Sequence, residues 1–163
     1  MSLINHRRRS AIWHGASQKV GQSATPLFLD RIDIQCEITP VPFKDISQAA
    51  PGEPSATIRE RVIAARQIQE QRYNDIKGIH CNAQMTERMI HQYAEPDADS
   101  VEVLRSAMER LSLSARAYSR ILKVARTIAD LDGSEKVQLP HIAEAIGYRQ
   151  LDRGDWAERG MYS

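Results

Sequence analysis

The longest amphipathic pattern in the chain is the stretch SARAYSRILKVARTIADLDG, residues 114–133. Its apolar residues recur at the spacing that places side chains on one face of an α-helix. They are Tyr118, Ile121, Leu122, Ala125, Ile128 and Ala129. Gly133 follows, as glycine commonly does just past the end of a helix. An apolar stripe must be buried against other elements, so this pattern predicts an amphipathic helix within a helical bundle.

Shorter helical patterns lie on both sides of this stretch. They cover about 56–75, with Ser55 as the expected N-cap; 83–94; 101–112, with Asp99 or Ser100 as the expected N-cap; and 140–151, which Pro140 opens. No internal repeat or low-complexity tract interrupts them. We therefore predict a mainly α fold with a four- or five-helix bundle over residues 56–151.

One β-strand is predicted upstream of the helices. Over residues 32–39 isoleucine and cysteine alternate with polar residues, a pattern typical of a strand with one wet face. The sequence contains no second convincing strand, and a lone strand leaves backbone groups unpaired. The simplest explanation is that the chain is the C-terminal part of a longer protein whose sheet lies upstream. A dimer that pairs two copies through residues 32–39 is a further hypothesis.

The composition divides the rest of the chain. Residues 1–25 are expected to be a weakly ordered leader, 26–40 the strand region, 41–55 a proline-rich linker and 152–163 a frayed tail. The formal net charge of +1 gives no global argument for nucleic acid or membrane binding, so such a case must rest on local patches.

The location is predicted from three features. The two cysteines, Cys36 and Cys81, form no CxxC pair and are expected to be free thiols in a reducing compartment. No apolar run approaches the ~20 residues that span a bilayer, and the N-terminus has no signal-peptide core. The protein is therefore predicted to be cytoplasmic, with no membrane partner.

Arg31 is the first candidate functional residue. It stands between Asp30 and Asp33 at the start of the expected strand. One interpretation is a set of local ion pairs. The other is an arginine that projects toward a neighbouring subunit's phosphate, a task for which the planar, permanently charged guanidinium is suited.

Arg116 is the second candidate. Arg116, Arg120, Lys123 and Thr127 follow at spacings of four, three and four, which makes a polar stripe opposite the apolar face. Such a stripe is often only a solvated helix face. However, Arg116 falls in the first turn, where unpaired N–H groups and the helix dipole favour an anion. Arg116, with Arg120 and Lys123 as weaker members, is therefore a candidate phosphate site.

Other candidates are weaker. His80, Cys81 and His91 have no spacing typical of a metal site, and Asp130 and Asp132 are interpreted as capping or solvent-facing residues. GASQKVGQS (15–23) is not a phosphate-binding loop, because its second glycine is displaced and glutamine stands at the lysine position.

Four ordered blocks together resemble a known family. PLFLDRIDI (26–34), PGEPSATIRERVIAARQIQEQRY (51–73), LSARAYSRILKVARTIADLDGSEKV (113–137) and HIAEAIGYRQLDR (141–153) resemble the C-terminal end of the magnesium-chelatase-like AAA+ ATPases of the ComM and YifB type. The resemblance covers about residues 26–153. It is more specific than any single motif.

The resemblance implies roles for particular residues. Arg31 corresponds to an arginine finger that acts in trans, at the last strand region of the ATPase core. Arg116 corresponds to the sensor-2 arginine, and the helices after the linker to the lid. The family works as ATP- and magnesium-dependent homo-hexameric rings, and its ComM-type members are associated with DNA branch migration in natural transformation.

The sequence also departs from the family. Walker A and Walker B segments are absent, and residues 1–25 do not resemble the family's segment at that place. This chain alone is therefore expected to hold neither ATP nor magnesium and to lack ATPase activity. The alternative hypothesis is an autonomous helical module that binds DNA or protein, with Arg59, Arg61, Arg66 and Arg72 as phosphate contacts.

Overall fold

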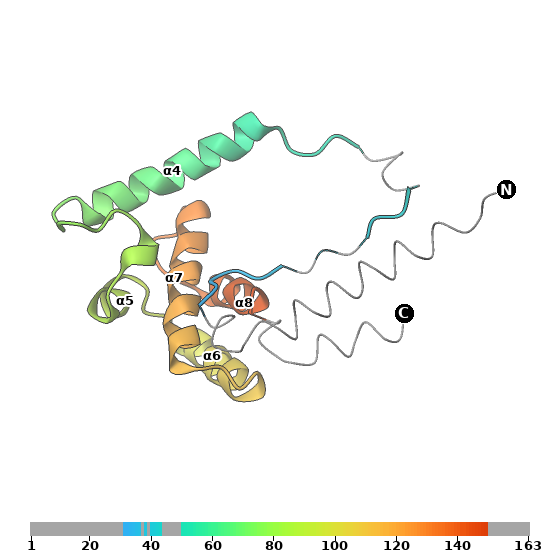
Figure 1. Cartoon of the computed structure of the whole chain (residues 1–163). Helices are drawn as coiled ribbons and strands as arrows, with labels where there is room; N and C mark the ends of the chain where they lie inside the picture. Colours follow the sequence, from blue (N-terminus) through green and yellow to red (C-terminus); the bar gives the residue numbers. More distant parts are fainter. Residues whose placement is uncertain (1–30, 37, 39, 44–49, 150–163) are drawn as a thin grey trace.

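Helices account for all the regular structure in the computed structural model, which describes residues 31–36, 38, 40–43 and 50–149 (Figure 1). These residues contain five α-helices and one 3-10 helix. In chain order they are α4 (Ser55–Tyr73), the 3-10 helix η1 (Asn82–Gln84), α5 (Glu87–Tyr93), α6 (Ala98–Arg110), α7 (Ala115–Leu131) and α8 (Leu139–Gly147). The mainly α fold class is confirmed. The predicted leader at 1–25 and tail at 152–163 lie outside the described residues.

Side-chain caps fix where several helices begin. The Ser114 hydroxyl accepts a hydrogen bond from the Ala117 N–H (3.1 Å) at the start of α7. At α6 the cap is Asp97, whose carboxylate accepts from the Ser100 N–H (2.8 Å), so the prediction of Asp99 or Ser100 was wrong. The Ser55 prediction was also wrong by one residue, because Ser55 is already helical and Pro54 holds the N-cap position without a side-chain cap.

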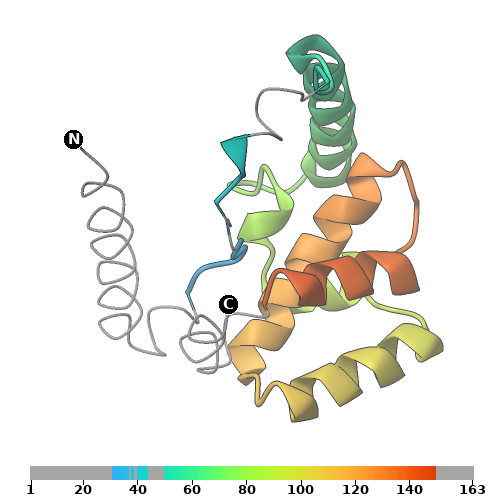
Figure 2. The same cartoon turned by 90° about the vertical axis from the view of Figure 1, so that its right-hand side faces the viewer.

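The core lies along the apolar face of α7. Ile121, Leu122, Ala125 and Ala129 are buried as their spacing predicted, and Tyr118 and Ile128 pack at its margin. Figure 2 shows α8 crossing α7 and α6 lying beside α8. Burying one leucine or isoleucine side chain contributes roughly 1.5–3 kcal/mol, so this stripe is a major source of stability. The other helices contribute the buried residues Met89, Ile90, Leu104, Ala107, Ile142, Ala145 and Ile146.

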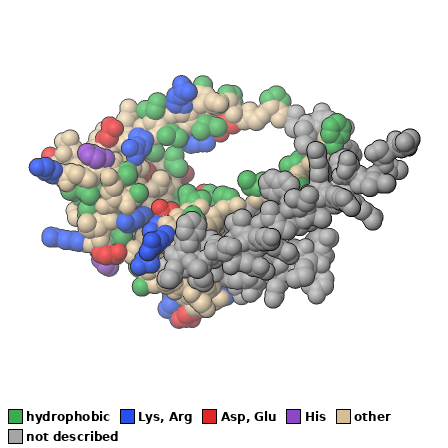
Figure 3. Space-filling view, in the orientation of Figure 1, with side chains coloured by type: hydrophobic (Ala, Val, Ile, Leu, Met, Phe, Trp, Pro, Cys, Tyr) green, Lys and Arg blue, Asp and Glu red, His purple; other side chains and the backbone are tan. Residues whose placement is uncertain are grey.

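Within the described part of the chain, helix α4 is anchored through its second half. Its second half buries Ala65, Gln69 and Tyr73, while residues 55–64 are all exposed. Tyr73 packs edge-to-face on Tyr93 with ring centroids 5.7 Å apart. In the space-filling view, hydrophobic side chains gather over α4 (Figure 3). The exposed apolar side chains Ile58, Val62 and Ile63 lie in the first half of α4.

The turn after α7 has the geometry of a Schellman motif. Gly133 has a positive φ of 71°, the Ser134 N–H donates to the Ala129 carbonyl (2.8 Å), and the Gly133 N–H donates to the Asp130 carbonyl (3.2 Å). The left-handed conformation requires glycine at this position. The chain therefore folds back at once toward α8, as the glycine in the sequence predicted.

The predicted strand over residues 32–39 is not shown. Residues 32–36 and 38 are described and none of them is in a strand. A strand needs a neighbour for its backbone, and here the Gln35 N–H donates instead to the carbonyl of Tyr148 at the end of α8 (3.0 Å). Ile34 and Ile38, expected on the buried face, are 52% and 91% exposed. Alternation alone therefore predicted a face that this segment does not bury.

Candidate functional site

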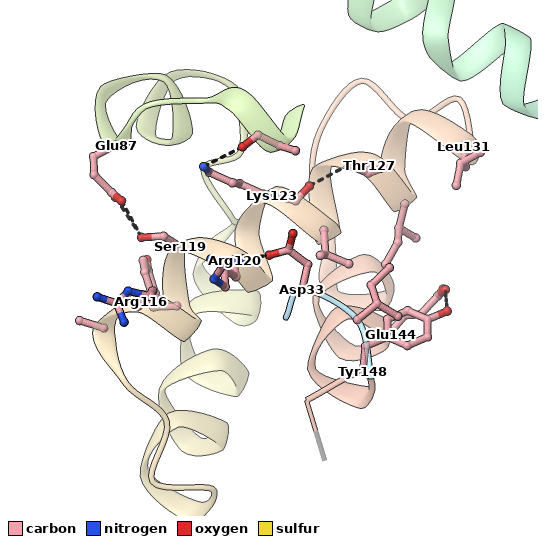
Figure 4. Close-up of a pocket in the computed structure, with 16 residues that line it drawn as sticks. Asp33, Glu87, Arg116, Ser119, Arg120, Lys123, Thr127, Leu131, Glu144 and Tyr148 are labelled. Carbon is pink, nitrogen blue, oxygen red and sulfur yellow. Dashed lines mark hydrogen bonds and ion pairs between the residues drawn. The ribbon is translucent and has the colours of Figure 1, made fainter. Parts of the chain in front are cut away.

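A groove of about 890 Å³ runs along the polar side of α7 (Figure 4). Segment 33–34, η1, the start of α5 and the end of α8 contribute to its walls. All four members of the predicted polar stripe line it, namely Arg116, Arg120, Lys123 and Thr127. An apolar surface formed by Ile34, Val124, Ile128 and Leu131 lines it as well. The stripe is thus a wall of a concave surface.

Arg116 lies in the first turn of α7 at the edge of this groove (Figure 4). Its side chain is exposed, and the Ser114 cap fixes the start of the helix two residues earlier. One turn further on, the Ser119 hydroxyl donates to the Glu87 carboxylate at 2.9 Å, which links α7 to α5. The position combines an exposed cation with the positive end of a helix dipole.

Arg120 contacts the segment that precedes the helical bundle. Its guanidinium forms an ion pair with the carboxylate of Asp33, 87 residues away in the sequence. The two side chains are 25% and 50% exposed. The structure thus places Arg120 in the groove, with an internal acidic partner that sequence reasoning did not find.

Lys123 and Thr127 connect α7 to the 3-10 helix. The Lys123 ammonium donates to the Ala83 carbonyl at 3.0 Å. The Thr127 hydroxyl donates to the Lys123 carbonyl (2.9 Å) and accepts from the Asn82 side-chain amide (3.0 Å). This half of the stripe therefore holds η1 against α7.

Tyr148 and Glu144 lie on the α8 side of the groove. The tyrosine hydroxyl donates to a Glu144 carboxylate oxygen at 2.9 Å. This hydrogen bond and the adjacent negative charge raise the pKa of Tyr148, because both favour the neutral phenol. The pair adds an acidic group to a groove whose opposite wall is cationic.

Arg31 lies outside the groove. It is exposed and stands two residues before Asp33, which does line the groove. The structure therefore brings Arg116, Arg120 and Lys123 together on one wall and leaves Arg31 on the segment beside them.

A buried ionic network lies beside the groove, and sequence reasoning missed it. Asp130 is fully buried and binds Arg72 of α4 through two hydrogen bonds of 2.8 and 2.5 Å. Arg126, one turn before it on α7, donates to the same carboxylate at 3.1 Å, and Asn82 donates at 2.7 Å. The interpretation of Asp130 as a capping or solvent-facing residue was therefore wrong, whereas Asp132 is indeed exposed.

The network holds its charges by mutual compensation. Burial opposes ionisation of Asp130, but hydrogen bonds from Arg72 and Asn82 and the charges of Arg126 and Arg72 outweigh it, so the pKa of Asp130 is lowered. Arg126 is 2% exposed and also donates to the carbonyls of Ser134 and Glu135 at 2.6 and 2.8 Å. The turn closed by Gly133 brings these two carbonyls to the guanidinium.

A signal for this network does exist in the sequence. Arg126 lies four residues after the buried Leu122, and Asp130 lies four residues after Arg126. That spacing puts both charges beside the apolar stripe on one face of the helix. An acid and a base next to a buried stripe can pair in the interior.

Among the four arginines of α4, three are exposed and Arg72 is partly buried. Arg72 is engaged by Asp130, and Arg61 makes two hydrogen bonds of 3.0 and 3.1 Å to the carboxylate of Glu53. Arg66 donates to the Gln69 side chain at 3.4 Å. A DNA-binding face along α4 would therefore draw on fewer available charges than the sequence indicates.

The remaining sequence candidates form no metal site in the described part of the chain. No group of three or more His, Cys, Asp and Glu side chains there could hold a metal ion. Cys36 and Cys81 are both free thiols. Among the described residues, no helix combines the length and apolar character needed to cross a bilayer.

The comparison with protein families gives a direct result. Residues 52–149 match the family "Magnesium chelatase, subunit ChlI C-terminal", which is well over half of the chain. The chain belongs to the magnesium chelatase ChlI C-terminal family. All five described α-helices fall within the matched residues, so the family match covers the whole described helical bundle. The resemblance to magnesium-chelatase-like proteins of the ComM and YifB type is thereby confirmed.

Individual relatives agree with this ChlI C-terminal assignment. YifB of Escherichia coli, described as uncharacterized, is 41% identical over 127 residues, which cover 77% of this chain and 24% of YifB. Competence protein ComM of Haemophilus influenzae is 40% identical over the same proportions. An uncharacterized protein of Mycobacterium bovis is 32% identical over 131 residues, covering 80% of this chain and 25% of that protein. The chain spans about a quarter of the length of these relatives.

Proposed function

We propose that this chain is the helical lid of a magnesium-chelatase-like AAA+ ATPase and that its groove faces ATP bound by the rest of the enzyme. The proposal rests on family membership together with one observation. Arg116, the residue that the resemblance matches to sensor 2, lies at the edge of the groove in the first turn of α7.

The groove residues suit a nucleotide. A guanidinium binds phosphate oxygens through paired, charge-assisted hydrogen bonds, and the dipole at the start of α7 favours the same anion. Apolar side chains such as Val124 and Ile128 line the surface beyond the cations. When bound, ATP would supply the phosphoryl group, and Arg116 would hold and orient its phosphates.

Magnesium has a weaker case in this part of the chain. The groove acids Glu87 and Glu144 each accept a hydrogen bond from a neighbouring hydroxyl, and Asp33 pairs with Arg120. A magnesium ion prefers several oxygen ligands in an octahedral arrangement. We therefore assign its ligands to the ATPase core of the full-length protein.

Arg31 would act on the ATP of a neighbouring subunit. Its exposure and its place outside the groove suit a residue that reaches across a ring interface, as the resemblance to an arginine finger implies. An arginine supplied in trans to a γ-phosphate accelerates hydrolysis by about 10³–10⁵-fold. The full-length protein would then be a homo-hexamer. DNA is its proposed substrate, on the basis of similarity to a competence protein.

Arg116→Ala in the full-length protein tests the lid assignment. Losing a hydrogen bond to a charged phosphate costs about 1.5–3 kcal/mol, so kcat/KM for ATP hydrolysis should fall roughly 10- to 150-fold. Arg105→Ala is the matched control, because Arg105 is exposed on α6 and pairs with Glu102 and Glu109. Wild-type kcat/KM in Arg116→Ala would contradict the proposal.

The DNA step needs a separate measurement. The full-length protein should hydrolyse ATP faster with branched DNA present and should move a four-way junction in an ATP-dependent way. Suppose that branched DNA does not accelerate ATP hydrolysis and the protein does not move the junction, while Arg116→Ala still impairs hydrolysis. The lid assignment then stands, and the substrate is a different one. Steeply salt-dependent duplex binding by this chain alone, without nucleotide, would instead support the autonomous DNA-binding module.

A further inference from the structure

We infer that Arg120 is a positioning residue that fastens segment 31–36 to the helical bundle, rather than a phosphate ligand. The inference deepens the proposed function and rests on it for the role of Arg31, which this segment carries. Its consequence is that Arg31 moves with the lid and not independently of it.

Three contacts fasten the segment. One comes from α7, and the other two come from the C-terminal end of α8 and the residue that follows it. On the α7 side, Arg120 pairs with Asp33. Next to α8, the Tyr148 carbonyl accepts the Gln35 N–H at 3.0 Å, and the guanidinium of Arg149 donates to the carbonyl of Ile32. Figure 4 shows Asp33 over Arg120, between α7 and α8.

One of the attachment points, Arg149, is deeply buried in the bundle. Arg149 is 1% exposed, and α7 and α8 are in contact, with Ile121 and Ile142 in the same buried core cluster. A segment tied to both helices at residues 32, 33 and 35 cannot follow another body without breaking these contacts. Arg31 adjoins the first tied residue, and its Cα is therefore about 3.8 Å from the Cα of Ile32.

The partner of Arg120 also argues against a phosphate role. The Asp33 carboxylate already binds one terminal nitrogen of the guanidinium and compensates its charge, so an incoming phosphate would have to compete with Asp33 for Arg120. Arg116 stands one turn nearer the start of the helix and is more exposed. The structure thus divides the stripe: Arg116 at the edge of the groove and Arg120 at the attached segment.

Hydrogen exchange of the Gln35 amide tests the attachment in the 163-residue chain. Asp33→Arg and Arg120→Asp each replace the pair by two like charges, and the double variant restores it with the signs exchanged. Each single variant should speed exchange at Gln35 about threefold or more, while amides of the α7 core keep their protection. The double variant should return to within about twofold of the wild type. Lys123→Gln is the control, because this cation bonds Ala83 and not the segment.

Each outcome decides between the alternatives. Asp33 is half exposed, so Asp33→Arg remains informative even if Arg120→Asp lowers the stability of the bundle. Unchanged exchange in Asp33→Arg, or no rescue in the double variant, would overturn the inference. So would a wild-type Gln35 amide that exchanges as in an unfolded peptide. Nucleotide plays no part in this experiment. If rescue occurs but Arg31→Ala leaves turnover intact in the full-length protein, the attachment stands and the finger assignment fails.

Discussion

Replacing Asp130 by asparagine probes the most consequential buried contact in the molecule. The side chain keeps its size but loses the negative charge that Arg72 and Arg126 share. Those guanidinium groups are 13% and 2% exposed, so neither can regain a full water shell without moving. The substitution therefore leaves two positive charges facing each other in the interior.

The expected loss is large for a single substitution. Removing one partner of a buried ion pair costs about 3–5 kcal/mol, because the remaining charge stays buried and uncompensated. A domain of this size is stable by roughly 5–15 kcal/mol, and each kcal/mol shifts its Tm by about 4–8 °C. We expect the Tm of Asp130→Asn to fall by at least about 12 °C.

Thermal and urea unfolding, followed by circular dichroism, measure this effect. Asp132→Asn is the matched control, because it is the same chemical change two residues further on, at a side chain that is 64% exposed and hydrogen-bonds to Ser134 and His141. It should change the free energy of unfolding by about 0.5 kcal/mol or less. The reasoning is refuted if the two variants unfold alike, or if Asp130→Asn loses less than 1 kcal/mol.

The Asp130 carboxylate also contributes to the loss of folding stability in acid. The pKa of Asp130 is lowered in the folded state, against about 3.9 in the unfolded chain. Its contribution is therefore fully present above pH ~4 and is lost as the pH falls through the folded value. Urea unfolding between pH 6 and 2 should show a steeper acid limb for the wild type than for Asp130→Asn. Asp132, whose pKa is also lowered, keeps its share of that limb in both proteins.

Three further predictions concern the turn after α7 and the two arginines. Gly133→Ala should lose about 1–2 kcal/mol in urea unfolding, because φ is 71° there although no atom lies within 4 Å of an added Cβ; an unchanged midpoint would contradict the argument. Arg31→Ala in the full-length protein should reduce ATP turnover at least 10³-fold and leave nucleotide affinity within about twofold, so surviving turnover would remove the finger assignment. The isolated 163-residue chain should show no ATP hydrolysis in a phosphate-release assay, and turnover that persists in its Arg116→Ala variant would contradict the lid mechanism.

Helical periodicity in the sequence predicted most of the fold. Ile121, Leu122 and Ala125 are buried where a 3.6-residue repeat placed them, because a helix fixes the direction of each side chain from local spacing alone. The same geometry put Arg116, Arg120 and Lys123 on one wall of the groove. Local spacing thus predicted both faces of α7.

Partners distant in sequence were not predictable in this way. The alternation over 32–39 indicated an apolar face, but a strand also needs a neighbour, and the described segment bonds to Tyr148 instead. Asp130 looked like a helix-end residue, because nothing near it in sequence reveals Arg72, 58 residues earlier. Asp33 and Arg120 are 87 residues apart, so their pairing likewise depends on the tertiary fold.

Because α4 is anchored near its C-terminal end, a small tilt of the helix moves its N-terminal end by a larger distance. A helix of 19 residues is about 28 Å long, and Arg72 fastens it near its last turn to Asp130 of α7 while residues 55–64 stay exposed. A tilt of about 10° about Arg72 moves Ser55, which is about 25 Å away along the helix axis, by roughly 4 Å. A small rotation of α7 that tilts α4 would therefore move the N-terminal end of α4 by more than the length of a hydrogen bond.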